Sequence, residues 1–219
     1  MSENSPKILI LHDYFLYRGG GERLVISLAK NLHADIATAF IGKDAFDPRT
    51  EGINTVELYK EKGWSNMPGF RYLQVQFSFL FKTDFAKKYD IIIYSGDCLI
   101  AQLRTWKKDT KHIAYMHTPP RHLYDTYRDR LKQYPLWKKI IFIPFVRFNR
   151  WRFEYLSRKL DLIITNSKNT KERIKRYLKL DSVVVYPPCN TLPFKNLGYV
   201  DYFFSWARLY DVKRVDKIV

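Results

Sequence analysis

The sequence predicts a doubly wound α/β domain of the Rossmann-like type, in which a parallel sheet is covered by helices on both faces. Two observations lead to this prediction. Short apolar runs alternate with longer segments whose apolar residues recur at helical spacing, a rhythm typical of repeated βα units. The apolar runs also end in glycine, proline or polar residues, as buried parallel strands do at the edge of a sheet.

The first βα unit is the clearest. Residues 7–12 form a short apolar run that is typical of a buried strand, and the glycine-rich turn 18–21 follows it. The next segment is expected to be a helix because its apolar residues fall on one face, namely Leu24, Val25, Leu28, Ala29 and Leu32. Gly42 and Asp47-Pro48 are loop residues, and they separate two further strands expected at 34–41 and 53–59.

The same rhythm continues to residue 186. A helix is expected at 70–85, where the apolar residues at helical spacing are Leu73, Phe77, Leu80 and Phe81. A strand at 112–116 ends before Pro119-Pro120, since proline cannot continue a ladder. The remaining expected elements are a strand at 90–95, a long helix at 136–160 bent at Pro144, a strand at 160–166, a basic helix at 169–180 and a strand at 183–186.

These elements place most of the chain in one domain. We expect a domain at 1–189, a linker at 190–200 that contains proline, glycine and asparagine, and the beginning of a second domain at 201–219. Within the last segment, residues 202–206 predict a strand and residues 207–216 a loop that opens a helix. We expect this second unit to be incomplete in the 219 residues.

Composition excludes several classes of protein. With 46% hydrophobic and 27% charged residues, the chain has the composition of a folded protein with a substantial core. Its two cysteines, Cys98 and Cys189, lack metal-ligand spacing, and we expect two buried thiols in a reducing cytosol. The run 140–146 is too short to span a bilayer, and the run 8–11 is too short for a signal peptide, so we expect neither a transmembrane helix nor an export signal.

The net charge of +16 indicates an anionic partner, and half of it lies in residues 121–159. This basic segment has eleven cations, three carboxylates and ten aromatic residues. The combination suits an anionic membrane surface, with contacts expected from Lys138, Lys139, Arg147 and Arg150. Single-stranded nucleic acid is a second candidate partner. The composition is also explained without any partner, by a partly buried helix with a basic exposed ridge.

Residues that follow strands are the candidates for a site, because ligands bind at the carboxyl ends of parallel strands. The turn Gly19-Gly20-Gly21 opens a helix and would leave free N–H groups facing an anion or a hydroxyl, although a flexible turn explains it equally well. It does not match the dinucleotide fingerprint. His117 follows another strand beside Arg121, whereas Asp97 and either Ser167 or Asn169 are expected to cap helices. No Ser-His-Asp order, zinc motif or Walker loop is present.

Five motifs together resemble the amino-terminal half of family 4 glycosyltransferases, which are retaining enzymes of the GT-B fold. They are the run 7–10, the turn Gly19-Gly20-Gly21-Glu22-Arg23, the segment Tyr115-Met116-His117-Thr118-Pro119-Pro120-Arg121, Thr165-Asn166-Ser167 and Tyr186-Pro187-Pro188. The segment 204–216 looks like the entry into that family's second domain. The His-Thr-Pro-x-Arg order points to the mannosyltransferase-like branch, but His122 and Tyr124 replace its aromatic pair.

The resemblance implies a role for each matching position. Gly20 and Gly21 would border the donor diphosphate, Gly19 and Arg121 the acceptor, and His117 would approach the transferred sugar as the catalytic residue. Arg208 and Lys213 would neutralise the leaving nucleotide diphosphate, so no metal or other cofactor is expected.

The whole protein would then transfer a hexose, with mannose one candidate, from a nucleotide sugar to a lipid-linked or cell-surface saccharide. We expect it at the cytoplasmic face of the membrane in polysaccharide biosynthesis. The 219 residues alone are expected to be inactive. A separate donor-domain polypeptide is the alternative, and nucleic acid is not an expected partner.

Overall fold

A computed structural model describes residues 5–60, 68–189, 195, 198, 199, 201 and 215–217. The chain divides into two compact units, Met1–Pro187 and Pro188–Val219. In the second unit the described residues include a short 3₁₀ turn, η6 (Val215–Lys217). The strand expected at 202–206, most of the linker, Arg208 and Lys213 lie outside the described residues.

The first unit is built on a seven-stranded parallel sheet in the order β3-β2-β1-β4-β5-β6-β7, which confirms the predicted fold class. The strands are β1 (Ile8–His12), β2 (Asp35–Thr38), β3 (Thr55–Glu57), β4 (Ile91–Ser95), β5 (Lys111–Met116), β6 (Leu162–Thr165) and β7 (Val183–Val184). Register pairs His12 of β1 with Ser95 of β4, and Ser95 with Tyr115 of β5. The carboxyl ends of these three strands therefore meet at one edge of the sheet.

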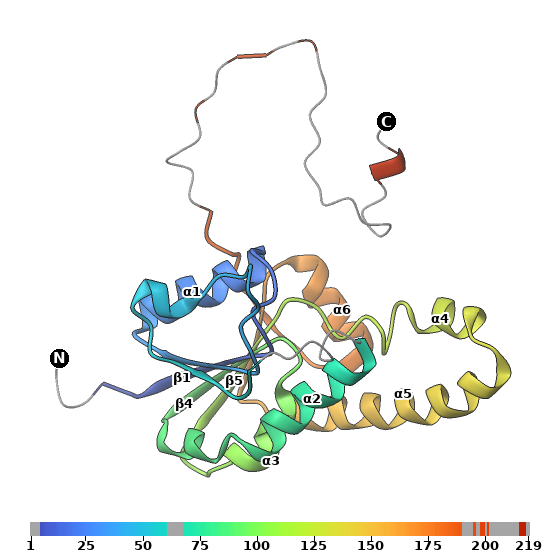
Figure 1. Ribbon diagram of the computed structural model, residues 1–219, viewed down its shortest axis with the longest axis horizontal. Helices are drawn as coiled ribbons and strands as arrows, with labels where there is room; N and C mark the ends of the chain where they lie inside the picture. The colour runs from blue at the N-terminus through green and yellow to red at the C-terminus, as the bar shows by residue number, and fades with distance from the viewer. Residues whose placement is uncertain are drawn as a thin grey trace. The chain divides into compact units, whose positions relative to one another are not determined.

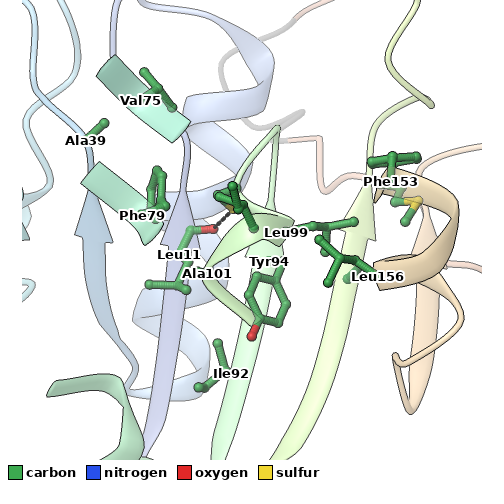
Figure 2. Packing of buried hydrophobic residues seen from close by; sticks show 14 of the residues in the cluster. Leu11, Ala39, Val75, Phe79, Ile92, Tyr94, Leu99, Ala101, Phe153 and Leu156 are labelled. Atoms are coloured by element: carbon green, nitrogen blue, oxygen red, sulfur yellow. Dashed lines mark hydrogen bonds between the residues drawn. The ribbon is translucent and has the colours of Figure 1, made fainter. Parts of the chain in front are cut away.

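Helices cover both faces of the sheet (Figure 1). They are α1 (Gly20–Leu32), α2 (Pro68–Phe81), α3 (Gln102–Thr105), α4 (Tyr127–Gln133), α5 (Leu136–Ser157) and α6 (Lys168–Leu178), with 3₁₀ turns η1 (Pro48–Glu51), η3 (Asp84–Lys88) and η4 (Leu99–Ala101). α1 packs on one face through Leu24, Val25 and Ala29. The other face carries α2, η4, α5 and α6, and Figure 2 shows Phe79 and Leu156 packed there with Leu11, Ile92 and Tyr94 of the strands.

The helix ends follow local chemistry. The hydroxyl of Ser167 accepts a hydrogen bond from the backbone N–H of Thr170 at 3.2 Å, so Ser167 caps α6 as predicted. Asp97 caps no helix, because its carboxylate lies among the strand ends and η4 begins after Cys98 without a side-chain cap. The expectation of two buried thiols is wrong for Cys189, which is exposed, whereas Cys98 is buried.

The side of α2 that faces the core is not the one that its sequence periodicity suggests. In α2 the core side is formed by Val75 and Phe79, whereas Leu73, Phe77 and Phe81 point outward. Because α2 is apolar almost all round, periodicity alone does not determine which stripe faces the sheet. In α5 the buried stripe is Val146, Asn149, Phe153 and Leu156.

Candidate functional site

Three polar side chains form a row where β1, β4 and β5 end. Nδ1 of His12 lies 3.2 Å from Oγ of Ser95, and the same hydroxyl lies 3.4 Å from Nε2 of His117. His12 and Ser95 are buried, and His117 is half-buried. The serine hydroxyl therefore lies between the two imidazoles, within reach of a ring nitrogen of each.

Asp13 and Asp97 place two carboxylates beside this row. Oδ1 of Asp13 accepts the backbone N–H of Tyr14 at 2.9 Å, and Oδ2 accepts the N–H of Asp97 at 3.2 Å. Gly96 stands against the Asp13 carboxyl with φ of +86°, and a Cβ there would lie 2.4 Å from the carboxyl carbon. Only glycine suits this position, both for its backbone conformation and for the space that Asp13 occupies.

Burial determines the protonation of these groups. It lowers the pKa of His12 to about 4, and it lowers the pKa of His117, to which the neighbouring His12 also contributes. Burial raises the pKa of Asp13 to about 6 and that of Asp97 to about 6. At pH 7 the imidazoles are therefore neutral and most of the carboxylates are ionised. Such an edge accepts hydrogen bonds from hydroxyl groups and repels a phosphate placed directly on it.

The glycine turn lies beside His117 and supplies the opposite polarity. Gly19 is the N-cap of α1 and makes no side-chain capping hydrogen bond. A Cβ on Gly21 would be 3.8 Å from the His117 ring, which places the first turn of α1 next to that imidazole. The Glu22 carboxylate occupies the space beside Gly19. The first turn of α1 carries the positive end of the helix dipole, and the carboxylate of Glu22 lies beside it.

A cavity of about 1070 Å³ opens in front of these groups. Its polar end is lined by His12, Asp13, Gly21, Asp97 and His117. The cavity continues between α2, α4 and α5, where aromatic and aliphatic side chains (Tyr72, Leu73, Tyr134, Phe142, Phe145 and Phe153) line it together with Arg71, His122 and Arg130. One ligand with a polar head and an apolar extension would match both ends.

Hydrogen bonds between α2 and α5 hold the cavity wall in place. Arg152 donates to the Tyr72 hydroxyl at 3.0 Å and to Oε1 of Gln76 at 2.8 Å. Nε2 of Gln76 in turn donates to the backbone carbonyl of Asp97 at 2.8 Å. The Tyr72 hydroxyl donates to Oδ1 of Asn149 at 2.8 Å. This network connects the strand-end carboxylate to both long helices.

The structure brings together some of the residues selected from the sequence and separates others. His117 and Gly21 line the cavity, with Gly19 and Gly20 in the adjoining turn. Arg121 is exposed, and its Nε lies 3.6 Å from Asp125, outside the cavity lining. His12 and Asp13 were not selected, although their position directly after the first apolar run was a signal for them.

The four cations expected at a membrane are in different environments. Lys138 and Arg147 are exposed on α5, and Lys139 is half-buried. Arg150 is half-buried, donates to the backbone carbonyl of Leu123, and lies over the rings of Tyr124 and Tyr127 at 5.1 and 5.4 Å. Its contacts are those of a residue that joins α5 to α4 and the segment before it. Within the described ranges, no helix has the length and apolar character to cross a membrane.

Comparisons with known proteins agree with this architecture. The model of glycosyltransferase family 4 matches residues 18–191. Two crystal structures of HepE from Anabaena, one with UDP-glucose and one with UDP and glucose, superpose on 85% of this chain with TM-scores of 0.53 and 0.54. Their sequence identities to it are 15% and 17%, so this likeness shows the fold alone. The chain spans 45% and 46% of their lengths. A search of curated proteins found no match.

Proposed function

Because the chain belongs to glycosyltransferase family 4, we propose that it forms the acceptor-side half of an enzyme that transfers a hexose from a nucleotide sugar with retention of configuration. The observation that carries this proposal is the cavity at the carboxyl ends of β1, β4 and β5, where His117 meets the first turn of α1. The fold is the Rossmann-like half of the GT-B type.

Two kinds of group in this cavity support sugar transfer, namely the N–H groups at the start of α1 and the neutral imidazole of His117. Departure of a nucleoside diphosphate leaves negative charge, and the free N–H groups at Gly20 and Gly21 are placed to receive part of it. The neutral imidazole of His117 can donate a hydrogen bond to a sugar hydroxyl or accept one from it, without carrying charge of its own. We propose that Arg208 and Lys213 complete the diphosphate site and that no metal or other cofactor takes part.

Different observations favour the donor and the acceptor. HepE binds UDP-glucose, which favours a nucleotide hexose as donor here, and the His117-Thr118-Pro119-Pro120-Arg121 segment keeps mannose as a candidate. The apolar part of the cavity favours a lipid-linked saccharide as acceptor. Gly19 and Arg121 stay proposed acceptor contacts on the motif match alone, since neither lines the cavity. Such acceptors lie at the membrane, so we propose peripheral attachment at its cytoplasmic face and a role in polysaccharide biosynthesis.

A second part is needed to complete this reaction. The chain spans under half the length of the HepE structures, and we propose that the rest of a donor site belongs to another part of the enzyme. That part is either in the same polypeptide or in a separate subunit. The 219 residues alone are therefore expected to transfer no sugar.

The test is transfer of labelled sugar from UDP-glucose or GDP-mannose to a polyprenyl-linked saccharide, with and without a polypeptide that supplies the second half of the fold. We expect transfer only with both halves, and a loss on the order of 100-fold for His117→Ala. His33→Asn is the control, because His33 ends α1 in a left-handed conformation that asparagine tolerates. Turnover by the chain alone, or transfer that His117→Ala leaves unchanged, would contradict the proposal.

A further inference from the structure

The outward sides of α2 and α5 carry an extended apolar surface, which we call the aromatic face. On α2 it consists of Phe70, Leu73, Phe77 and Phe81. On α5 it consists of Trp137, Ile140, Ile141, Phe148, Trp151 and Tyr155. The two helices lie on the same side of the sheet (Figure 1), so both stripes point away from it.

The spacing shows that this surface is a regular second face of each helix. At helical spacing the six residues of α5 fall in one stripe, opposite the buried stripe of Val146, Asn149 and Phe153. Neighbouring rings touch one another, with Trp151 and Tyr155 stacked at 5.8 Å and Phe77 and Phe81 stacked at 6.0 Å. The helix is therefore apolar on its solvent side as well as on its core side.

The exposure is large for a surface that faces water. Ile140 is 74% exposed, and Trp151 and Phe81 are each 60% exposed. Ten such side chains at about half exposure present on the order of 1,000 Å² of apolar surface in two stripes, so each stripe is comparable in area with the largest patch of a typical monomer. A surface of this size is a binding surface by default.

The charged residues around the aromatic face indicate the kind of partner that it binds. α2 contains no carboxylate, and Glu154 of α5 is half-buried and accepts a hydrogen bond from the Tyr124 hydroxyl at 3.2 Å. Cations flank the rings, since the ammonium group of Lys138 lies 5.1 Å from the Trp137 ring and that of Lys159 lies 4.4 Å from the Tyr155 ring. Exposed aromatic residues bordered by cations match the headgroup region of an anionic bilayer.

The cavity reaches the same surface. Leu73 belongs both to the aromatic face and to the cavity lining, and Phe145 lines the cavity with 36% of its surface exposed beside it. The apolar end of the cavity therefore opens between α2 and α5, next to the proposed lipid contact. We propose that the aromatic face docks on an anionic bilayer and that the apolar part of a lipid-linked acceptor enters the cavity beside Leu73 and Phe145. The acceptor step rests on the proposed function, whereas the docking step does not.

Vesicle flotation of the full chain tests the docking. Vesicles of phosphatidylcholine with about one third phosphatidylglycerol are compared with phosphatidylcholine alone, because anionic lipid should strengthen binding. We expect Phe77→Glu with Trp151→Glu to lower the partition coefficient for the anionic vesicles at least tenfold. Leu32→Glu is the matched control, since Leu32 is an exposed leucine of α1 on the opposite face of the sheet. If the charged pair unfolds, Phe77→Gln with Trp151→Gln replaces it.

The outcomes separate the possible occupants. Equal flotation of the wild type and the face variants, or equal binding to neutral vesicles, would overturn the docking. Light scattering that shows a wild-type dimer and a monomeric face variant would identify a second copy as the occupant and overturn it too. If the completed wild-type enzyme transfers sugar but binds no vesicles, the docking is refuted and the proposed sugar transfer still stands.

Discussion

The buried carboxylate of Asp13 makes a prediction about how stability depends on pH. In the folded chain its pKa is raised to about 6 from an ordinary value of 3.8, so the folded state binds the proton more tightly than the unfolded state. Between about pH 4 and 6 the unfolded chain therefore releases this proton first, and the contribution of Asp13 to the free energy of unfolding falls as pH rises. Above pH 6 this destabilisation is complete.

Asp13→Asn removes the pH-dependent contribution of this carboxylate to the free energy of unfolding. A shift of about two pKa units corresponds to at most about 3 kcal/mol. The Asp13 side chain is 20% exposed, so we reduce the expectation to about 1–2 kcal/mol. Asp13 also raises the pKa of Asp97, and its replacement acts in the same direction there. His12 and His122 have pKa values lowered to about 4, so their contributions rise with pH and partly offset the carboxylates in the wild type.

The measurement is urea unfolding of both proteins at pH values from 4 to 7. The variant loses the carboxylate that accepts two backbone N–H groups, which shifts its stability at every pH, so the slope with pH is the quantity to compare. We expect the free energy of unfolding of Asp13→Asn to rise by about 1–2 kcal/mol more than that of the wild type between pH 4 and 6. Parallel profiles would refute the assignment of a raised pKa to this carboxylate.

Two further predictions concern the same sheet edge. Gly96→Ala should lower the free energy of unfolding by about 3 kcal/mol and Gly52→Ala by only about 1, since both glycines have positive φ but only a Cβ at residue 96 displaces the Asp13 carboxylate; equal urea midpoints for the two variants would contradict this. Ser95→Ala should lower stability by about 1 kcal/mol and change the imidazole NMR signals of His117, because it removes the hydroxyl that this ring contacts. An unchanged His117 signal would contradict the contact between the Ser95 hydroxyl and the His117 ring.

The strands could be predicted to within one or two residues where they are fully buried. β1, β4 and β5 are continuous apolar runs with a clear polar or proline boundary, and their predicted and observed ends nearly coincide. α4 was not predicted, because a helix of seven residues without buried residues leaves no apolar period in the sequence. The outward stripe of α2 was visible as a period, but an all-round apolar helix does not reveal which face is buried.

The candidate site was predictable only in part. Polar residues after strands identified His117 and the glycine turn, and a family resemblance gave them roles. The link from His12 through Ser95 to His117 depends on the strand order β1-β4-β5, which sequence periodicity does not contain. The environment of Arg150 likewise depends on the fold, because its carbonyl and ring partners come from the segment that precedes α5.

The central claim is that a nucleotide sugar contacts the cavity where α1 begins beside His117. Amide and imidazole NMR signals of the full chain during titration with UDP-glucose measure this most directly. We expect the largest changes at the amides of Gly20 and Gly21 and at the His117 ring, with NAD⁺ producing none at these positions. Saturable binding of UDP-glucose that leaves these three signals unchanged would contradict the account.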